Sequence, residues 1–582
     1  MDVQQKSTRA FFMTFTLLMA IGAHYFQHNQ GGSGLELAQN NVVWIFFSIL
    51  IGLGLWKITE QKTIIYSRFT IIFLIAVVLF FIPLFYPNNE LANQSYTRLL
   101  GLLAGFLFYV SLQQFQFNKA QLQRLLLLIV LAGFIESCYS LAQDYLFTAN
   151  NILGYNINYG RPYGIFQQPN VLASFMATTM ILSGYLLQQF NNKKIQVFLL
   201  LSILLNVWVI TITMSRTGYL GSLIAIFLFI PFAWKNNKNK TTIFLFTIFL
   251  GFGAALLSSY IEKTDILASH KIENIKEGGR RIEIYKNSIL MVKDKPLLGY
   301  GYGSFYKNYL TFQAERFKNN EIPRPKPTDL THPHNETLYW AIEGGIIPVL
   351  AILLLVFGFL NLFRGSKISH SCALTALVLP IALHTQTEYP LYQSALHWLV
   401  LLFLVFYVSS QIEVNKKKEF KLTFALHTFA ITIPLATSLF MVTNIYTIYK
   451  MTKFERNLPP DINLLLDIVN PIVFENKLNF HLNYYRLLAA EQLHKPEEAR
   501  KIITWTEEIL KNKPHSYFYV ILYRAYINNN EVEKANKLLS YARYLYPADY
   551  VLANVDKPHR ESEAESVTIT DAPAAIKSRN SQ

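Results

Sequence analysis

The chain has 582 residues, 52% of them hydrophobic and only 15% charged, with a mean hydropathy of +0.25. Water-soluble proteins of this length carry more charge, so the composition excludes a soluble globular protein and indicates a membrane protein. The net charge of +15 follows the loops, as described below, and nucleic-acid binding is therefore not implied.

Apolar runs long enough to cross a bilayer as a helix, about 17–25 residues each, recur along the first 450 residues. The first follows Lys6 and Arg9 and lacks a small-residue cleavage site, so we expect a retained helix and not a signal peptide. The pattern predicts an all-α polytopic membrane protein with about 13 transmembrane helices. The expected spans are 10–27, 42–58, 67–86, 98–117, 122–147, 170–190, 196–214, 217–234, 242–260, 338–363, 371–389, 393–411 and 421–450.

Lysine and arginine are concentrated in alternate loops, whereas the short loops between these hold only Arg98, Arg161 and Arg216. The positive-inside rule then places the N-terminus in the cytoplasm, and an odd number of spans places the C-terminal tail outside. Cys138 and Cys372 both lie inside apolar runs, so neither a disulfide framework nor a zinc pattern is expected. A Walker-type phosphate loop is missing from the sequence, which argues against ATP as the driving force.

The loop 148–169 lies on the outer side by this charge pattern and is rich in glycine, amides and aromatic residues. Arg161 is its one charge, and Gln168 and Asn170 near its end are amides of the kind that bind sugars. A turn-rich connector without a binding role is the alternative interpretation, because these residue types favour turns.

Arg216 lies in the very short outer turn Ser215-Arg216-Thr217-Gly218. Placing an arginine at membrane depth costs about 2.5–3.5 kcal/mol, so we expect an anionic partner for it. Snorkelling of its side chain to the lipid headgroups is the alternative.

The longest segment between spans, 261–337, is also on the outer side. It contains a predicted amphipathic helix from Arg280 to Lys293, which includes Arg281, and then the glycine-rich stretch LLGYGYGSF. This stretch follows no strand, so the pattern is a weak indication of a phosphate loop. A long loop with many aromatic residues is expected to be functional and not disordered.

Two polar clusters stand at the ends of predicted membrane helices. His332, His334, Asn335 and Glu336 precede one span, where polar groups are unfavourable unless they face a cavity or a partner. The alternative is an interfacial helix start with Asn335 as its cap. The second cluster follows span eleven and contains His384, Glu388 and Tyr389 before Pro390, a pattern typical of a broken helix end or of an interfacial aromatic anchor.

Residues 451–582 have the composition of a soluble region. Helical periodicity at 479–493, 496–512, 515–528 and 531–545 resembles tetratricopeptide-type hairpins, which often present a concave surface to a peptide. A stabilising cap is the alternative. We therefore expect a transmembrane catalytic domain (1–450, including the loop 261–337), a helical domain (451–555) and a disordered tail (556–582).

All of these polar clusters share one predicted side of the membrane. Arginine forks bind phosphate oxygens, and a nearby histidine can exchange a proton close to neutral pH. The set is suited to chemistry on a phosphorylated lipid at the outer leaflet, and the sequence shows no carboxylate-rich metal motif. The candidate binding residues are Arg161, Gln168, Asn170, Arg216, Arg281, His332, Asn335, Glu336, Glu388 and Tyr389.

The order of motifs G-R-P-Y-G-I-F-Q-Q-P-N, S-R-T-G, R-I-x-x-Y, P-L-L-G-x-G-x-x-x-F, H-P-H-N-E-x-L with E-x-G, and H-x-x-x-E-Y-P-L resembles bacterial O-linked oligosaccharyltransferases of the PglL type. These are grouped with O-antigen ligases and Wzy polymerases. The resemblance covers nearly the whole chain, and H-P-H-N-E with E-Y-P-L is its specific part. Tyr285 is a departure, because tryptophan is more usual at that position.

The resemblance implies transfer of a preassembled glycan from undecaprenyl diphosphate to Ser or Thr of a periplasmic protein, often a type IV pilin. It implies an inner-membrane enzyme that needs no metal or other cofactor. His334 would be the essential histidine, Arg216 and Arg281 would bind the diphosphate, and Gln168 and Tyr389 match functional positions. His334 would act either as a base toward the acceptor hydroxyl or as a protonated group that holds the leaving diphosphate.

Other functions share part of this pattern. An O-antigen ligase would use a lipid A-core acceptor, and a Wzy polymerase would extend the glycan on lipid. The E-Y-P-L motif and the helical tail favour a protein acceptor. A non-enzymatic transporter of lipid-linked glycans would place polar groups near the middle of the membrane and show internal repeats, whereas here the polar groups gather on one side.

Overall fold

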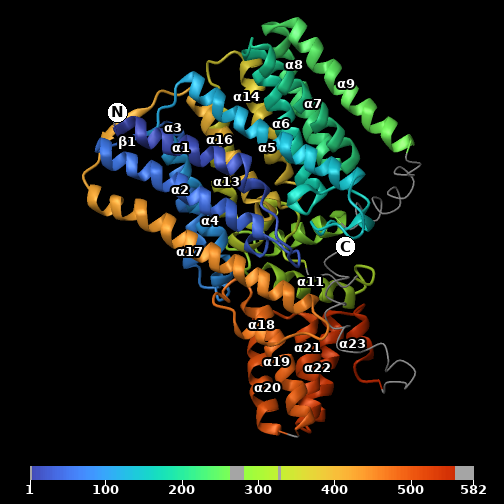
Figure 1. The fold of residues 1–582 in the computed structure, drawn as a ribbon. Helices are drawn as coiled ribbons and strands as arrows, with labels where there is room; N and C mark the ends of the chain where they lie inside the picture. Colours follow the sequence, from blue (N-terminus) through green and yellow to red (C-terminus); the bar gives the residue numbers. More distant parts are fainter. Residues whose placement is uncertain (1–2, 262–280, 326–329, 494, 558–582) are drawn as a thin grey trace.

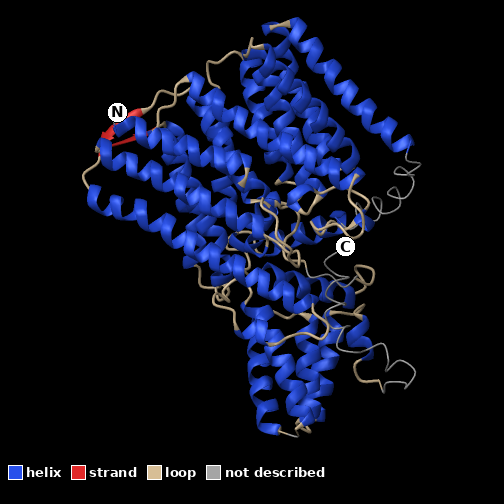
Figure 2. Ribbon diagram, viewed as in Figure 1, coloured by secondary structure: helices blue, strands red, loops and turns tan. Residues whose placement is uncertain are grey.

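The computed structural model describes residues 3–261, 281–325, 330–493 and 495–557 (Figure 1). Within these residues the chain is helical almost throughout, with one two-stranded ribbon as its only sheet (Figure 2). The predicted all-α polytopic membrane fold is confirmed. Most of the predicted disordered tail, 558–582, lies outside the described residues.

Each apolar run predicted to cross the membrane contains a helix. Among the described residues, nine helices are long and apolar enough to span a bilayer, and three further apolar helices are shorter. Together with α1, the helices that cover the predicted spans are α1 (Val3–Ala20), α2 (Ala38–Gln61), α3 (Arg68–Phe81), α4 (Tyr96–Gln114), α5 (Lys119–Tyr145), α6 (Pro169–Gln189), α7 (Lys193–Thr213), α8 (Arg216–Asn236), α9 (Lys238–Ile261), α13 (Ile346–Leu362), α14 (Ile368–His384), α16 (Ala395–Ser410) and α17 (Thr423–Arg456).

Helix α6 forms the centre of the bundle, and nearly all of its residues are buried. Its many Ala, Ser, Thr and Gly residues let neighbouring helices approach closely, which is how helices associate in lipid. A Cβ added at Gly133 of α5 would lie 2.4 Å from Thr179 Oγ1 of α6. Because α6 begins at Pro169, the loop before it is held at one end of this rigid centre.

The two ends of the bundle carry different loops. Strand β1 (Thr63–Tyr66) pairs antiparallel with β2 (Lys416–Glu419), and both strands belong to lysine-rich loops predicted to share one side. Figure 1 shows this ribbon beside the N-terminus, far from the C-terminal helices α19–α22. The loops with the polar motifs meet at the end nearer to these C-terminal helices.

The predicted continuous span 338–363 is broken into two helices, α12 (Glu336–Gly344) and α13. Gly345 separates them with a left-handed backbone (φ 66°), and a Cβ there would lie 2.1 Å from the carbonyl oxygen of Leu297. Hydropathy is continuous across the break, so the sequence pattern missed it. The break makes α12 a short, separate helix that carries the H-P-H-N-E motif at its start.

The glycine-rich stretch 297–305 fastens α12 in place. The backbone N–H of Tyr300 donates to the carbonyl of Ile342 (2.8 Å), and the N–H of Gly301 donates to the carbonyl of Glu343 (2.9 Å). Gly301 has φ 98°, and a Cβ there would lie 2.0 Å from the carbonyl oxygen of Asn88. The glycines therefore serve a close backbone contact, and the stretch holds α12 by its backbone groups.

Helix α17 continues to Arg456, so the boundary expected at residue 450 falls inside a helix. The helices beyond it follow the predicted ranges closely and stack as antiparallel neighbours: α19 (Glu475–Gln492), α20 (Pro496–Asn512), α21 (Ser516–Asn528) and α22 (Val532–Leu545). Helix α11 (Phe305–Lys318) contributes Leu310 and Ala314 to their hydrophobic core. The long loop and the C-terminal helices are thus packed together.

Candidate active site

His334 stands immediately before α12 in a left-handed backbone conformation (φ 56°), which is uncommon for a residue with a side chain. Its backbone N–H donates to Nδ1 of His332 (2.9 Å), and its carbonyl accepts from the hydroxyl of Tyr285 (3.0 Å). Its imidazole lies beside the ring of Tyr389, with centroids 5.3 Å apart. Side chains from three segments therefore determine where this imidazole points.

Asn335 caps α12, because its side-chain oxygen accepts from the N–H of Leu338 (2.9 Å). The amide nitrogen of the same side chain donates to the carbonyl of Gln386 (2.9 Å), and the N–H of Glu336 donates to the carbonyl of Thr385 (2.9 Å). These bonds tie the H-P-H-N-E motif to the loop after α14. The cap that the sequence allowed as an alternative is present, and it also joins two of the predicted clusters.

Glu388 gathers three of the predicted residues around one buried carboxylate. Gln168 Nε2 donates to its Oε2 (2.8 Å), Asn170 Nδ2 donates to its Oε1 (2.7 Å), and the guanidinium of Arg281 pairs with the same Oε1. The Glu388 side chain is only 2% exposed, whereas that of Arg281 is 29% exposed. Glu388 therefore fixes the orientation of the Arg281 guanidinium, and part of the Arg281 side chain remains exposed.

Arg161 and Arg216 lie close to the junction between α7 and α8. Arg161 donates from Nε to the carbonyl of Thr213 at the end of α7 (2.8 Å). Arg216 is exposed as the first residue of α8, after the cap Ser215. Its neighbour Thr217 shares a hydroxyl contact with Thr387 (3.2 Å), which brings the S-R-T-G turn next to the Glu388 segment.

His332 and Glu336 form a buried pair behind His334. Burial lowers the pKa of His332 below its ordinary value and outweighs the attraction of Glu336. Its Nδ1 already accepts an N–H, so the proton of the neutral ring is on Nε2, which faces Glu336 Oε2 at 3.3 Å. Burial alone would raise the pKa of Glu336, but the hydrogen bond from His332, the charge of Arg98 and the bond from Tyr392 lower it. Glu336 thus stays ionised beside a neutral His332.

Both carboxylate oxygens of Glu336 bond to other side chains of the protein. Its Oε1 accepts from the indole of Trp340 (2.7 Å) and from the hydroxyl of Tyr392 (2.8 Å), and its Oε2 faces His332. Burial raises the pKa of Tyr389, and the charge of Glu388 adds to this rise, so its hydroxyl keeps its proton near neutral pH. Glu336 is therefore engaged inside the protein, whereas Arg281 keeps part of its side chain exposed.

Sequence reasoning missed several residues that hold this geometry. In the sequence Arg98 served only to predict the membrane orientation. In the structure its Nη2 pairs with Glu343 Oε2 (2.6 Å) at the far end of α12, and its guanidinium carbon lies 3.9 Å from the centre of the Trp340 ring. Glu343 also accepts the N–H of Phe305 (3.0 Å). The E-x-G motif was the available signal for Glu343, and an arginine at the start of an outer helix was the signal for Arg98.

His384, by contrast, lies away from the other predicted histidines. It is completely buried, and its Nδ1 contacts Ser174 Oγ (2.7 Å) in the centre of the bundle, where Ser174 also contacts His397 Nε2 (3.2 Å). The structure places it among core helices and not with His334. Its role is to pack and hydrogen-bond α14 against α6.

Left-handed backbone also marks the other two predicted segments. Gln167 has φ 58° just before Gln168, and Met214 has φ 49° just before the S-R-T-G turn. Such conformations cost of order 1–3 kcal/mol and persist where surrounding contacts impose them, often at functional sites. Arginines from three segments, a histidine and a tyrosine thus gather at one end of the bundle, an arrangement able to bind an anion next to a proton-exchanging group.

Comparison with known families agrees with this grouping. Residues 199–354 match the family described as O-Antigen ligase, residues 372–560 match Virulence factor membrane-bound polymerase, C-terminal, and residues 162–187 match Protein glycosylation ligase. A general O-oligosaccharyltransferase of Acinetobacter baylyi (strain ATCC 33305 / BD413 / ADP1) is 22% identical over 427 residues, covering 71% of each chain.

The matched regions contain the residues that the structure brings together. Gln168 and Asn170 lie in the glycosylation-ligase match, Arg216, Arg281 and His334 lie in the O-antigen-ligase match, and Glu388 lies in the polymerase match. By these matches the chain resembles the bacterial O-linked oligosaccharyltransferases of the PglL type, together with the O-antigen ligases and membrane-bound polymerases.

Proposed function

We propose that this protein is a protein O-oligosaccharyltransferase. It moves a preassembled glycan in one step from undecaprenyl diphosphate to the hydroxyl of Ser or Thr in a periplasmic acceptor such as a type IV pilin. The observation that carries the proposal is the meeting of His334, Arg281, Gln168 and Tyr389, from four separate segments, around the buried carboxylate of Glu388. The named activity of the Acinetobacter relative supports the same reaction.

In the proposed reaction the acceptor oxygen forms a bond to the anomeric carbon of the first sugar. The bond between that carbon and the diphosphate oxygen breaks, and the electron pair leaves with the diphosphate. The hydroxyl proton passes to His334 or, if that ring is already protonated, to water. The diphosphate is a good leaving group, so stabilising its developing charge lowers the barrier.

Arg281 and Arg216 are the proposed diphosphate ligands. Arg281 is anchored on one side by Glu388, which leaves its exposed edge for a phosphate oxygen. Arg216 is exposed at the start of α8, where the helix N-terminus also favours an anion. Arg161, whose Nε holds the end of α7, would complete the positive rim.

His334 is the proposed catalytic residue, and Tyr389 lies against its ring. Gln168 and Asn170 hold Glu388, and His332, Asn335 and Glu336 hold the start of α12, so these are proposed to position the site. The proposed mechanism uses side chains alone, without a metal.

The orientation proposed is the one that the lysine and arginine pattern predicts: an inner-membrane protein with a cytoplasmic N-terminus and a periplasmic site. Two observations support it. The lysine-rich loops assigned to the cytoplasm pair as β1 and β2, and the loops assigned to the periplasm meet around Glu388 at the other end.

The C-terminal helices are proposed to orient the protein acceptor. They are tied to the long loop by the hydroxyl of Tyr306, which contacts His515 Nδ1 (2.8 Å) and the Tyr546 hydroxyl (2.6 Å). The same loop continues to the H-P-H-N-E motif. A protein held against these helices would therefore lie on the side of the membrane that carries the site.

Reconstitution tests the function directly. The full chain in proteoliposomes is supplied with a lipid-linked oligosaccharide and a purified pilin, and intact mass is measured on the protein and on the lipid. The expected result is one complete glycan added to the pilin, with equal yield after EDTA treatment. Longer glycan on lipid without modified protein would instead establish a Wzy-type polymerase, and transfer only to lipid A-core would establish an O-antigen ligase.

A further inference from the structure

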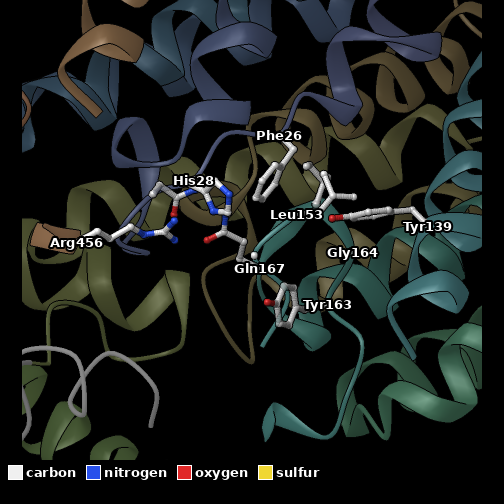
Figure 3. A pocket seen from close by; sticks show the side chains of 11 residues that line it. Phe26, His28, Tyr139, Leu153, Tyr163, Gly164, Gln167 and Arg456 are labelled. Atoms are coloured by element: carbon white, nitrogen blue, oxygen red, sulfur yellow. The ribbon is translucent and has the colours of Figure 1, made fainter. Parts of the chain in front are cut away.

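A hollow opens beside the site that the proposed reaction does not use. It is lined by Phe26, His28, Asn29, Tyr139, Leu153, Gly154, Tyr163, Gly164, Ile165, Gln167 and Arg456. These residues come from the segment after α1, from α5, from the loop before α6 and from the last turn of α17. Figure 3 shows His28 and Arg456 on one side, Tyr139 on the other, and Gln167 and Tyr163 between them.

The floor of this hollow is held rigidly by buried polar groups. Gln143 Oε1 accepts the backbone N–H groups of Tyr163 (3.1 Å) and Gly164 (2.8 Å), and Glu136 Oε2 accepts the N–H of Ile165 (3.1 Å). Glu136 is itself paired with His24 at 2.5 Å. The buried side chains of Gln143 and Glu136 thus fix the backbone of residues 163–165 that forms the floor. Such a floor is typical of binding sites that are already formed before the ligand binds.

The groups that face the hollow suit a sugar. Tyr139, Tyr163 and Phe26 offer aromatic faces and Gln167 offers an amide, and such sets pack on sugar rings and bond to hydroxyls.

His28 and Arg456 add hydrogen-bonding groups on one side. Partial burial and the charge of Arg456 lower the pKa of His28, so that ring is neutral near pH 7; one ring nitrogen bonds to the backbone of Ile152, and the other is left for a sugar hydroxyl. Arg456 lines the hollow beside His28, and the side-chain hydrogen bonds and ion pairs found among the described residues do not involve it, which leaves its donors for a ligand.

The hollow adjoins the reaction centre through two consecutive residues. Gln167 lines the hollow, and Gln168, one residue later and about 3.8 Å away along the chain, bonds to Glu388. The left-handed backbone of Gln167 sends these neighbouring side chains to different places. A molecule extending from the centre beside Glu388 can therefore reach this hollow.

We propose that this hollow binds a sugar of the donor glycan beyond the one attached to the diphosphate, so that it measures glycan length or identity. The proposal rests on the proposed function. The first sugar must lie at the reaction centre, and the hollow lies to one side of that centre. A peptide acceptor would need an extended groove or a free strand edge, whereas this hollow is closed by four segments.

Kinetics on the full chain in nanodiscs test the proposal with two donors, undecaprenyl diphosphate carrying one sugar and the same lipid carrying a trisaccharide. Arg456→Ala should raise KM for the trisaccharide donor by about tenfold, the size of a lost hydrogen bond to a charged group, and leave kcat and the one-sugar donor unchanged. Lys453→Ala is the control, because Lys453 is an exposed base on the same helix that does not line the hollow.

A binding measurement separates failure of this proposal from failure of the proposed function. Saturation-transfer NMR with the free trisaccharide needs no transfer reaction, and its signal should weaken in Arg456→Ala but not in Lys453→Ala. Equal KM changes for both donors, a change only in the acceptor KM, or no trisaccharide binding to the wild type would overturn the sugar site. A wild type that binds the trisaccharide but transfers nothing would overturn only the proposed function.

A second inference comes from the segment after α17. Residues 458–472 turn back along this helix: Lys450 Nζ pairs with Asp467 (2.8 Å), and Asn470 Nδ2 donates to the carbonyl of Phe440 (3.1 Å) and to Thr443 Oγ1 (3.0 Å). From Arg456 to Phe440 is about 24 Å along a helix axis. The segment therefore returns to the level at which α17 still exposes Leu439 and Val442.

This returning segment exposes apolar side chains at that level. Leu466 is 66% exposed, Val469 72% and Ile472 67%. Tyr446 and Tyr449 of α17 are also exposed. Aromatic residues of this kind mark the membrane interface. We infer that residues 466–472 insert into the lipid headgroup region and fix the C-terminal helices relative to the membrane surface, because their exposed apolar side chains lie at the level where α17 exposes Leu439 and Val442.

Spin labels test this inference in the full chain reconstituted in phosphatidylglycerol-containing vesicles, with both native cysteines changed to serine. Labels at Val469→Cys and Ile472→Cys should show higher collision rates with oxygen, which concentrates in lipid, than with a water-soluble nickel complex. Val532→Cys on α22, 52% exposed, is the aqueous control. Water-like accessibility at 469 and 472, equal to that at 532, would overturn the anchor.

Discussion

His334 depends on two neighbours that act on its backbone and not on its ring. His332 accepts its N–H through a ring nitrogen, and Tyr285 donates a hydroxyl to its carbonyl. The resemblance to the PglL-type enzymes leads us to expect tryptophan at position 285, where this chain has tyrosine. Its hydroxyl contact explains how tyrosine can support the site here. His334 is the residue expected to react, whereas His332 and Tyr285 are expected only to position it.

Replacing His334 with alanine should abolish glycan transfer while the protein still folds and inserts, because the proposed proton-exchanging group is gone. His332→Ala should keep partial activity, since it removes only a positioning contact. Both variants are scored by glycosylated acceptor in membranes with matched protein levels. Full transfer by His334→Ala would remove this residue from the mechanism.

The neutral state of His332 gives the site a pH dependence. Its pKa in the folded protein is below the ordinary value of 6.5, so the unfolded chain binds the proton more readily. The contribution to folding stability is therefore present above about pH 6.5 and is lost as the pH falls below that value. We expect wild-type activity to decline on acidification through this range.

The control for this acid sensitivity is His332→Asn, whose amide oxygen can accept the His334 N–H without titrating. Activity measured from pH 5 to 8 should be lower in this variant but flatter below pH 6.5 than in the wild type. Identical acid profiles for the two proteins would show that another group controls the decline.

Arg281 and Glu388 should behave as one unit. Arg281→Lys replaces a two-pronged cation by a point charge that cannot hold both Glu388 and a phosphate, so activity should fall roughly 10- to 100-fold. Glu388→Gln should reduce activity as well, because Arg281 loses its anchor. The measurement is kcat/KM for the lipid donor, and the double variant should be no worse than the poorer single variant. Unchanged activity in Arg281→Lys would make this arginine structural only.

At the scale of elements, the site depends on the separate helix α12 being held at both ends. Its start is tied to the loop after α14 by Asn335, and its end is held by the glycine-rich stretch and by the Arg98–Glu343 pair. Hydropathy alone joined α12 to α13, and only the contact of Gly345 with Leu297 shows where the chain must break.

Gly301→Ala should therefore disrupt the site at a distance. The added Cβ would lie 2.0 Å from the carbonyl oxygen of Asn88 at φ 98°, a strain of order 1–3 kcal/mol. We expect a lower melting temperature and loss of most transfer activity. Gly253→Ala on α9 is the matched control, because a Cβ there meets nothing within 4 Å. Equal melting temperatures for the two variants would contradict the role of the glycine-rich stretch 297–305 in holding α12.

At the scale of the whole molecule, the C-terminal helices and the site lie toward the same end of the bundle, away from the β1–β2 ribbon (Figure 1). Alkaline phosphatase fused after residue 557 should consequently be active in the periplasm, and the same enzyme inserted after Lys62 should be inactive. The readout is phosphatase activity normalised to the amount of fusion protein. The reverse pattern would invert the orientation on which the proposed acceptor rests.

The sequence by itself determined the membrane class, the helices over the predicted spans and the four C-terminal helices. These follow from hydropathy and helical periodicity, which are local properties that each segment carries on its own. The same local reading, with the resemblance, also selected His334, Arg281, Gln168 and Glu388 as candidates. Their residue types could be recognised because charged and amide groups are unfavourable at the ends of membrane helices.

Only the tertiary structure decided which candidates meet and what each one touches. Glu388 binds Gln168, 220 positions away in the chain, and Arg281, 107 positions away. His384 carries the same imidazole as His334, yet it is buried in the core against Ser174. Contacts between segments so far apart depend on how the helices pack around α6, and a periodicity within one segment contains no information about that packing.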